Sequence, residues 1–298
     1  MEAREKFKGV NSIKFHRAFT NDDDCYRYIA SIKWGDENYK CKKCGQEKYC
    51  NGKKPYSRRC IKCGYDESPT SGTMFDKCKF SLHIAFHIAF KISTKKKGMS
   101  SLELSKEFEL RQMTCWEFKW KIQQAMQSSK RHPLEGEVQV DDFYIGGSEE
   151  QKRGRSKGKK RLVVIALEKV KNGVGRAYAQ LIEHASVEEF KPFFNDYISN
   201  NADVITDEWP GYFPLRNEYP TLKQIPSNDG KNLPDLHIHI MNLKSWLRGI
   251  HHHCSKERLQ GYLDEYHFRY NRRNNMDTIF DNLIVRMVNN SPIRKNQS

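Results

Sequence analysis

Residues 138–147 read VQVDDFYIGG, and this stretch decides the fold class. Its apolar and aromatic residues largely alternate with the others, and a glycine pair follows, which predicts a β-strand that ends in a turn. Asp141 and Asp142 interrupt the strand, although strands disfavour aspartate and a buried carboxylate requires a cation or hydrogen-bond donors. The interruption predicts either a metal ligand in the middle of a sheet or an edge strand whose charges face water.

The segments that follow predict the rest of this sheet. Residues 162–167, LVVIAL, form a continuous apolar run that is typical of a central strand, and residues 174–181 supply a third strand. A helix is expected over residues 187–199, and a short apolar strand over residues 204–206, directly before Asp207. Three strands, a helix, a strand and a further helix predict an α/β domain whose mixed sheet is flanked by helices.

The charge balance indicates a polyanionic partner. The 298 residues include 52 Lys and Arg against 37 Asp and Glu, which gives a net charge of +15. Nucleic acid is the first candidate partner for such a protein, and a merely basic soluble protein is the alternative. The chain has no long apolar run, and its first residues, MEAREK, lack the apolar core of a signal peptide. We therefore expect a cytoplasmic, nucleoid-associated protein that does not contact a membrane.

Four of the nine cysteines have the spacing of a metal site. Cys41 and Cys44 form one C-x-x-C-G knuckle, and Cys60 and Cys63 form a second one after fifteen intervening residues. Two such knuckles complete a tetrahedral zinc site, and structural zinc supplies folding free energy that a small module cannot gain from its core. We predict a zinc ribbon rather than four unrelated thiols. The ribbon is basic and aromatic between its knuckles, which suits DNA backbone contact, although zinc ribbons also dock proteins.

Two short helices joined by a tight turn are predicted between the ribbon and the sheet. The first runs to Phe108 with Ser100 or Ser101 as its cap, and the second covers about residues 115–128. Lysine, arginine and glutamine in the turn and the second helix can reach base edges and phosphates, which favours a helix-turn-helix. A helical packing module without a DNA role is the alternative.

Two further basic segments flank the predicted sheet and its last helix. Residues 151–161, QKRGRSKGKKR, are cationic and interleaved with glycine, which is typical either of a DNA-binding loop or of a solvated hairpin. Arginines also gather at the end of a helix expected over residues 256–274, where they suit both the helix dipole and phosphates. The last fifteen residues or so are expected to be a frayed helix and tail. The residues predicted to contact DNA are Arg111, Gln112, Lys119, Lys121, Arg153, Arg155, Lys157, Lys159, Lys160, Arg269, Arg272 and Arg273.

Asp141 and Asp207 carry the predicted chemistry. One lies in the first strand and the other just past the fourth, so they become neighbours if these two strands lie side by side. Carboxylates on adjacent strands bind hard cations, and a pair of cations about 4 Å apart can activate a water and stabilise a leaving oxygen. Together with the basic charge, this arrangement favours phosphoryl transfer on nucleic-acid phosphodiesters.

Several separate motifs now resemble one family, the ISXO-type insertion-sequence transposases. They are the two C-x-x-C knuckles, the SGT linker at residues 71–73, VDDFYIGG at 140–147, TDEWPGY at 206–212 and LQ-x-YLDEY-x-FRYNRR at 259–273. The resemblance implies a zinc ribbon followed by an RNase H-like domain of the DDE type. It also implies that Asp141 and Asp207 hold the catalytic Mg²⁺ or Mn²⁺ ions.

The third member of the expected DDE set departs from the family pattern. These transposases place a glutamate on a late helix, often with Lys or Arg seven residues further on, and here His237 stands seven residues before Lys244. Since relatives use His or Asn at this place, the resemblance implies His237 as the third ligand or water-orienting group and Lys244 as a phosphate contact. Imidazole favours Mn²⁺ over Mg²⁺. The alternatives to His237 are Asp235, His239, Asn242 and Glu265.

The expected function is therefore that of a DNA transposase. It would bind the terminal inverted repeats of its element, hydrolyse a phosphodiester and transfer the freed strand to target DNA, as a homodimer or a larger synaptic assembly. The alternatives are a two-metal DNA nuclease without strand transfer, and a zinc-ribbon regulator whose catalytic site has decayed. The expected domains are an N-terminal helix and zinc ribbon at residues 1–75, a helical DNA-binding region at 76–132 and an RNase H-like catalytic domain with C-terminal helices at 133–298.

Overall fold

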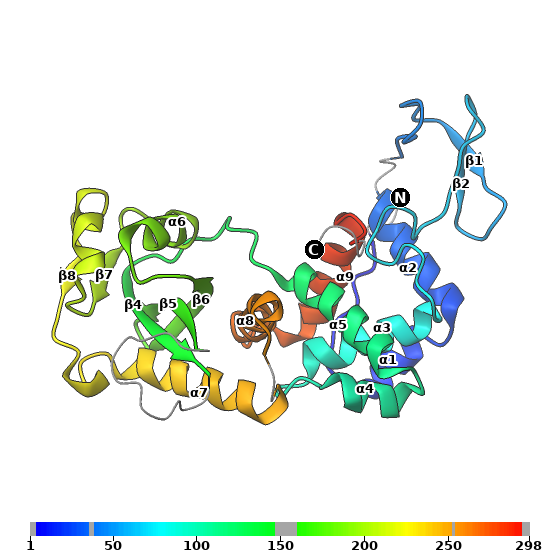
Figure 1. Cartoon of the computed structure of the whole chain (residues 1–298). Coiled ribbons are helices and arrows are strands. Elements are labelled where there is room, and N and C mark those ends of the chain that lie inside the picture. Colours follow the sequence, from blue (N-terminus) through cyan, green and yellow to red (C-terminus); the bar gives the residue numbers. More distant parts are fainter. Residues whose placement is uncertain (1–3, 36–38, 147–159, 252–253, 294–298) are drawn as a thin grey trace. The chain divides into compact units, whose positions relative to one another are not determined.

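The computed structural model describes residues 4–35, 39–146, 160–251 and 254–293 (Figure 1). The chain divides into two compact units. The helical unit combines Met1–Met126 with Arg272–Ser298, and the sheet unit covers Gln127–Asn271. This division differs from the expected domains at the C-terminus, because the residues after Asn271 group with the helical unit.

The helices of the helical unit begin where the sequence provides caps. The Asn21 side chain accepts a hydrogen bond from the backbone of Asp24 at the start of α2, and Ser100 and Glu103 form a reciprocal capping box at the start of α4. The predicted helix–turn–helix pair is present as α4 and α5, although α5 begins three residues earlier than expected. The helices of this unit are α1 (Ser12–Ala18), α2 (Asp22–Trp34), α3 (Leu82–Thr94), α4 (Ser101–Phe108), α5 (Gln112–Met126), a 3-10 turn, η4 (Met276–Thr278), and α9 (Ile279–Asn289).

The C-terminal helix α9 is a core element of the helical unit, so the expectation of a frayed helix is wrong for the residues up to Asn289. Its Phe280 is fully buried, with ring centroids between 5.4 and 5.8 Å from those of five other phenylalanines. Asp281 accepts hydrogen bonds from the guanidinium of Arg4, which ties the first described residues to α9. The aromatic rings that surround Phe280 are Phe7, Phe15, Phe19, Phe86 and Phe90.

The predicted zinc ribbon is a small antiparallel sheet of β1 (Tyr49–Asn51), β2 (Arg58–Cys60) and β3 (Asp66–Glu67). Its attachment to α2 uses a buried carboxylate. Glu67, only 1% exposed, pairs with the ammonium groups of Lys33 at 2.8 Å and Lys42 at 2.9 Å. A buried carboxylate requires such partners, and here two cations supply them.

The sheet unit contains the predicted mixed sheet, with the strands in the order β6-β5-β4-β7-β8. Its edge strand β8 was not predicted. The first three strands pair antiparallel, whereas β7 pairs parallel with β4 and β8 parallel with β7. This order places the first strand, with its aspartates, in the centre of the sheet beside the fourth, which excludes the edge-strand alternative. The strands are β4 (Glu137–Ile145), β5 (Arg161–Val170), β6 (Gly173–Ile182), β7 (Asp203–Thr206) and β8 (Lys223–Gln224).

Helices cover both faces of this sheet, and successive residues of each strand serve opposite faces. On one face, α6 (Val187–Tyr197) and the 3-10 helix η2 (Pro210–Asn217) pack on residues that include Val138, Val140 and Val164. On the other, α7 (Pro234–Ile250) and α8 (Lys256–Tyr270) pack on residues that include Phe143, Val163 and Ile165. Figure 1 shows α7 running along the sheet. The mixed α/β fold expected from the sequence is confirmed.

Among the described residues, no helix combines the length and the apolar character that a membrane crossing requires.

Candidate active site

Asp141 and Asp207 occupy equivalent positions on two adjacent parallel strands. Val140 pairs with Thr206 across the β4–β7 ladder, so the next residue on each strand is an aspartate. The backbone N–H of Trp209 donates to Oδ1 of Asp207 at 3.1 Å, which fixes that carboxylate where the strand ends. The sheet therefore places Asp141, in the middle of β4, beside Asp207, which directly follows the carboxyl end of β7.

His237 lies beside Asp141, as predicted. Its Nε2 atom is 3.7 Å from Oδ2 of Asp141, and the histidine side chain is 35% exposed while the aspartate side chain is 14% exposed. Helix α7 places it there, because Leu236 and Ile240 bury their side chains in the core below the same sheet face. Burial first, and the charge of Lys244 second, lower the pKa of His237, which favours the neutral imidazole that binds metals.

Lys244 lies two turns further along α7, near the same strand. Its Nζ atom is 4.9 Å from the ring centroid of Phe143, which follows Asp141 on that face of β4. Burial lowers the pKa of Lys244, and the charge of Arg248 adds to this effect, while the charge of Asp141 opposes it. The ammonium is thus a half-buried cation close to the candidate site.

The four alternatives to His237 are engaged or placed elsewhere. Asp235 forms an ion pair with Lys169, and Glu265 is buried and paired with Arg269. The buried His239 ring has its Nε2 atom 3.2 Å from Nε2 of His267. Asn242 is exposed on α7. His237, by contrast, lies against Asp141, an aspartate of the predicted pair.

The sequence did not indicate the roles of three residues that follow Asp207, namely Trp209, Gly211 and Tyr212. The hydroxyl of the buried Tyr212 donates to Oδ1 of Asp142 at 3.3 Å. Burial, and then the charges of Asp142, Asp141 and Asp207, raise the pKa of Tyr212 well above its usual range. The indole N–H of Trp209 donates to the carbonyl of Ala185 at 2.8 Å.

Gly211 leaves the space that the Trp209 hydrogen bond needs. A Cβ atom at Gly211 would lie 2.8 Å from the indole nitrogen and 2.9 Å from the carbonyl oxygen of Ala185. This is closer than real Cβ atoms approach, so a larger residue would break the turn that follows Asp207. The turn formed by the TDEWPGY motif thus holds the carboxylate of Asp207 in place. The position of Trp209 and Gly211 in this motif, directly after Asp207, was the sequence signal that could have indicated their role.

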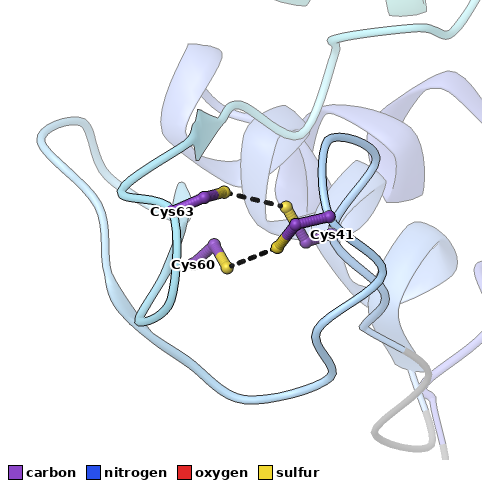
Figure 2. Close-up of side chains that lie close together, drawn as sticks. Cys41, Cys60 and Cys63 are labelled. Atoms are coloured by element: carbon purple, nitrogen blue, oxygen red, sulfur yellow. Dashed lines mark hydrogen bonds between the residues drawn. The ribbon is translucent and has the colours of Figure 1, made fainter.

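The four predicted zinc ligands come together in the ribbon (Figure 2). Their sulfur atoms lie within 4.8 Å of one another, with Cys41 and Cys63 at 3.5 Å and Cys44 and Cys60 at 3.5 Å. Tetrahedral bonds of 2.3 Å to zinc separate sulfurs by about 3.8 Å, so the group fits the ion. Burial alone would raise the pKa of the Cys41 thiol, but the backbone N–H groups of Cys44 and Lys43 lower it to about 6, which favours the thiolate that binds metal.

The glycine that follows each knuckle adopts the left-handed conformation that the C-x-x-C-G pattern predicts. Gly45 has φ +73° and Gly64 has φ +67°, and their N–H groups donate to the carbonyls of Cys41 and Cys60. Among the described residues, these four cysteines are the one group of possible metal ligands whose ligand atoms all lie within 4.8 Å of one another. The ligand atoms of Asp141, Asp207 and His237 do not all lie within that distance.

Two of the residues predicted to contact DNA are buried, so that prediction is corrected for them. Lys119 is 3% exposed and its ammonium donates to the carbonyl of Met99 at 2.6 Å. The Arg269 side chain is 7% exposed and pairs with Glu265 at 2.6 Å. Both cations are satisfied inside the protein, because α5 and α8 turn these positions inward.

The other residues of that set lie on or near the surface where they are described. Arg111, Gln112 and Arg273 are exposed. Lys121, Lys160 and Arg272 are half-buried. The remaining four, Arg153, Arg155, Lys157 and Lys159, lie outside the described residues.

The sequence of the sheet unit matches a known family. The model of the ISXO2-like transposase domain matches residues 133–271, which include Asp141, Asp207, His237 and Lys244. This segment is an ISXO2-like transposase domain. The match supports the resemblance seen in the sequence motifs, and the domain coincides closely with the sheet unit.

Two further comparisons accompany this family match. No curated protein matches the chain. Among solved structures, the chain is similar to one described as "Crystal structure of a pre-cleavage Mos1 transpososome", with a TM-score of 0.30 and 11% sequence identity. That similarity covers 66% of this chain and 76% of the other. The likeness to the transposase family rests on the match of residues 133–271.

Proposed function

We propose that this protein is a DNA transposase that cleaves the ends of its insertion sequence and joins them to target DNA. The observation that carries this proposal is the approach of His237 to Asp141, in a transposase domain where Asp207 follows the parallel partner of the Asp141 strand. A DDE-type site requires three such side chains from distant parts of the chain to meet beside one sheet.

The donor atoms present suit divalent cations. Asp141 and Asp207 offer carboxylate oxygens, which Mg²⁺ and Mn²⁺ both accept, and the imidazole of His237 shifts the preference toward Mn²⁺. When bound, such ions supply an activated water and stabilise the leaving oxygen of the phosphodiester. Asp141, Asp207 and His237 would hold them.

The remaining residues of the site act on the substrate and on the ligands. The ammonium of Lys244, which lies over the ring of Phe143 on the same face of β4 as Asp141, would bind the phosphate that is being cleaved, and its partial burial strengthens this charge interaction. The Trp209 N–H orients the carboxylate of Asp207. The Tyr212 hydroxyl holds Asp142, which keeps the second aspartate of β4 directed away from the ions.

DNA is the proposed substrate and partner. The net charge of +15 provides the long-range attraction for a polyanion. The ribbon and the exposed Arg111 and Gln112 at the start of α5 are proposed to contact the inverted repeats. Since both ends of an element must be held together for strand transfer, we propose that the protein acts as a dimer or a larger assembly.

The test uses a labelled duplex that carries the terminal sequence of the element, a supercoiled plasmid, and Mg²⁺ or Mn²⁺. We expect the wild type to cleave the duplex and to join its 3′ end to the plasmid, and Asp207→Asn to do neither. Asp203→Asn, an exposed aspartate at the start of the same strand, is the matched control and should retain both reactions. Cleavage without joining would identify a nuclease, and DNA binding without either reaction would identify a regulator. Wild-type activity of Asp207→Asn would refute the assigned site.

A further inference from the structure

The backbone of Gly230 packs directly against the imidazole of His237. A Cβ atom built on Gly230 would lie 2.9 Å from Cδ2, 2.9 Å from Cγ and 3.0 Å from Nδ1 of that ring. Real Cβ atoms essentially never approach other atoms this closely, so no side chain fits between the two residues as they stand. The nearest atoms surround Cγ, whereas Nε2 is the atom that faces Asp141.

The loop that carries Gly230 has little freedom to move away from this contact. Gly230 belongs to the 3-10 turn η3 (Asn228–Gly230), which lies between β8 and α7, and it has φ +82°. Its N–H donates to the carbonyl of Ser227 at 2.9 Å. The Asn232 side chain also donates to the carbonyl of Pro226 at 2.6 Å, which ties the two ends of the loop together.

The backbone of His237 is fixed as well. Its N–H donates to the carbonyl of Leu233 at 3.1 Å in the first turn of α7. Leu236 and Ile240, on either side of it in sequence, are buried in the core. With both backbones held, the orientation of the imidazole is the variable that a larger residue at position 230 would change.

We propose that Gly230 is a positioning residue that holds the His237 imidazole against Asp141. The contact supports the ring from the Cγ side and leaves Nε2 directed toward the carboxylate. A side chain at this position would rotate the imidazole away and remove Nε2 from the site. The effect of Gly230 on catalysis rests on the function proposed above. Its contact with His237 can be tested by a measurement that does not depend on enzyme activity.

Gly136 provides a matched control for Gly230→Ala. Both glycines belong to the sheet unit and have left-handed backbones, with φ +64° at Gly136, so alanine introduces similar backbone strain at either position. A Cβ atom at Gly136 meets nothing within 4 Å, in contrast to the one at Gly230. A difference between the two variants therefore reports the contact with His237 rather than the strain.

The first experiment follows the histidine imidazoles by NMR in the full-length protein labelled with ¹⁵N-histidine. His237→Ala identifies the His237 signal by its loss. We expect this signal to shift in Gly230→Ala and to stay in place in Gly136→Ala. An unchanged His237 signal in Gly230→Ala would overturn the proposal, whether or not the protein proves to be a transposase.

Stability and cleavage give a second readout through a double-mutant cycle. We expect Gly230→Ala to reduce cleavage of the labelled end by about 10-fold to 100-fold, because a small misplacement of a reacting group has effects of this size. Gly136→Ala should change it by no more than about 2-fold. In a protein that already carries His237→Ala, adding Gly230→Ala should lower cleavage by less than about a further 2-fold. Gly230→Ala should also lower the melting temperature less in this background, because the imidazole that clashes with the alanine is absent. Equal losses with and without the imidazole would refute the positioning role, whereas an inactive wild type would refute only the proposed function.

Discussion

Asp141 and Asp142 are adjacent in β4, yet they serve opposite faces of the sheet. Asp141 faces α7, where its carboxylate lies 3.7 Å from His237, and Asp142 accepts a hydrogen bond from Tyr212 among the residues packed under α6 and η2. The alternation of side chains along a strand imposes this separation. Of the two consecutive aspartates, Asp141 is therefore available to the proposed site, while Asp142 is held by Tyr212 on the opposite face.

We predict that the two aspartates differ sharply when each is changed to asparagine. Asp141→Asn removes a ligand and should lower strand cleavage by at least about 100-fold, while Asp142→Asn should lower it by about 10-fold or less. Cleavage rates in Mn²⁺ measure the difference, and melting temperatures confirm that both variants fold. Equal loss in the two variants would show that the face assignment of β4 is wrong.

Lys119 should behave as a structural residue rather than as a DNA contact. Its buried ammonium donates to the carbonyl of Met99, so Lys119→Ala should destabilise the helical unit by about 1–3 kcal/mol. Lys121→Ala, two residues further along α5, should leave stability nearly unchanged and weaken DNA binding instead. Urea unfolding and the salt dependence of DNA binding distinguish the two roles. A stable Lys119→Ala protein with weakened DNA binding would restore the original prediction for Lys119.

The sequence predicted the first three strands of the sheet because they are 9 or 10 residues long and are rich in apolar residues. It did not predict β8, which has only 2 residues and no apolar side chain. Residues 162–167 form a continuous apolar run, which predicted a central strand, and β5 (Arg161–Val170) contains them. The sequence indicated only that Asp141 and Asp207 become neighbours if the first and fourth strands lie side by side, and β4 and β7 do pair. The zinc ribbon was predictable because its four ligands lie within 23 residues.

Contacts between distant segments could not be predicted in the same way. Phe280 of α9 lies in the core of the helical unit because its ring contacts Phe15 of α1, Phe90 of α3 and Phe7 of the N-terminal segment. No local sequence pattern indicates those partners. Lys119 and Arg269 look like surface cations in the sequence, but their helices turn them inward. The contact of Gly230 with His237 joins a loop to a helix, and glycine carries no side chain that could have indicated it.

The zinc centre yields a prediction that contrasts two cysteines of the ribbon. Cys60→Ser removes one of four ligands, so bound zinc should fall from about one equivalent toward zero and the ribbon should unfold. Cys50 is exposed in β1 and outside the four-cysteine group, and Cys50→Ser should keep both the metal and the fold. Elemental analysis of the purified proteins measures the zinc, and circular dichroism follows the unfolding. Full zinc content in Cys60→Ser would exclude this four-cysteine site.

The interior of the sheet unit contains a pair of histidines that should make its stability depend on pH. His267 is fully enclosed between α7 and α8, where its Nδ1 atom lies 2.7 Å from the carbonyl of Leu263 and its Nε2 atom faces His239. Burial lowers the pKa of His267 from 6.5 to about 4, against the opposing effect of the Leu263 carbonyl. The folded protein thus holds a neutral imidazole that the unfolded chain would protonate.

The sign of the pH effect follows from this difference in pKa. Between pH 6.5 and 4 the unfolded chain binds more protons at His267 than the folded protein does, so the free energy of unfolding falls as the pH is lowered. The shift corresponds to about 3 kcal/mol over this range. Asp264 works in the opposite direction, because burial raises its pKa to about 7 and its protonation stabilises the folded state at low pH.

Because these two groups oppose each other, the prediction concerns the difference between a variant and the wild type. His267→Gln should lose the His267 contribution, so its free energy of unfolding relative to wild type should rise by about 3 kcal/mol as the pH falls from 7 to 4. His184→Gln, at an exposed histidine of the same unit, should show no such change. Urea unfolding at several pH values measures the difference. A constant difference between His267→Gln and wild type would mean that this imidazole has the same proton affinity in the folded and unfolded states, which is incompatible with its enclosure between α7 and α8.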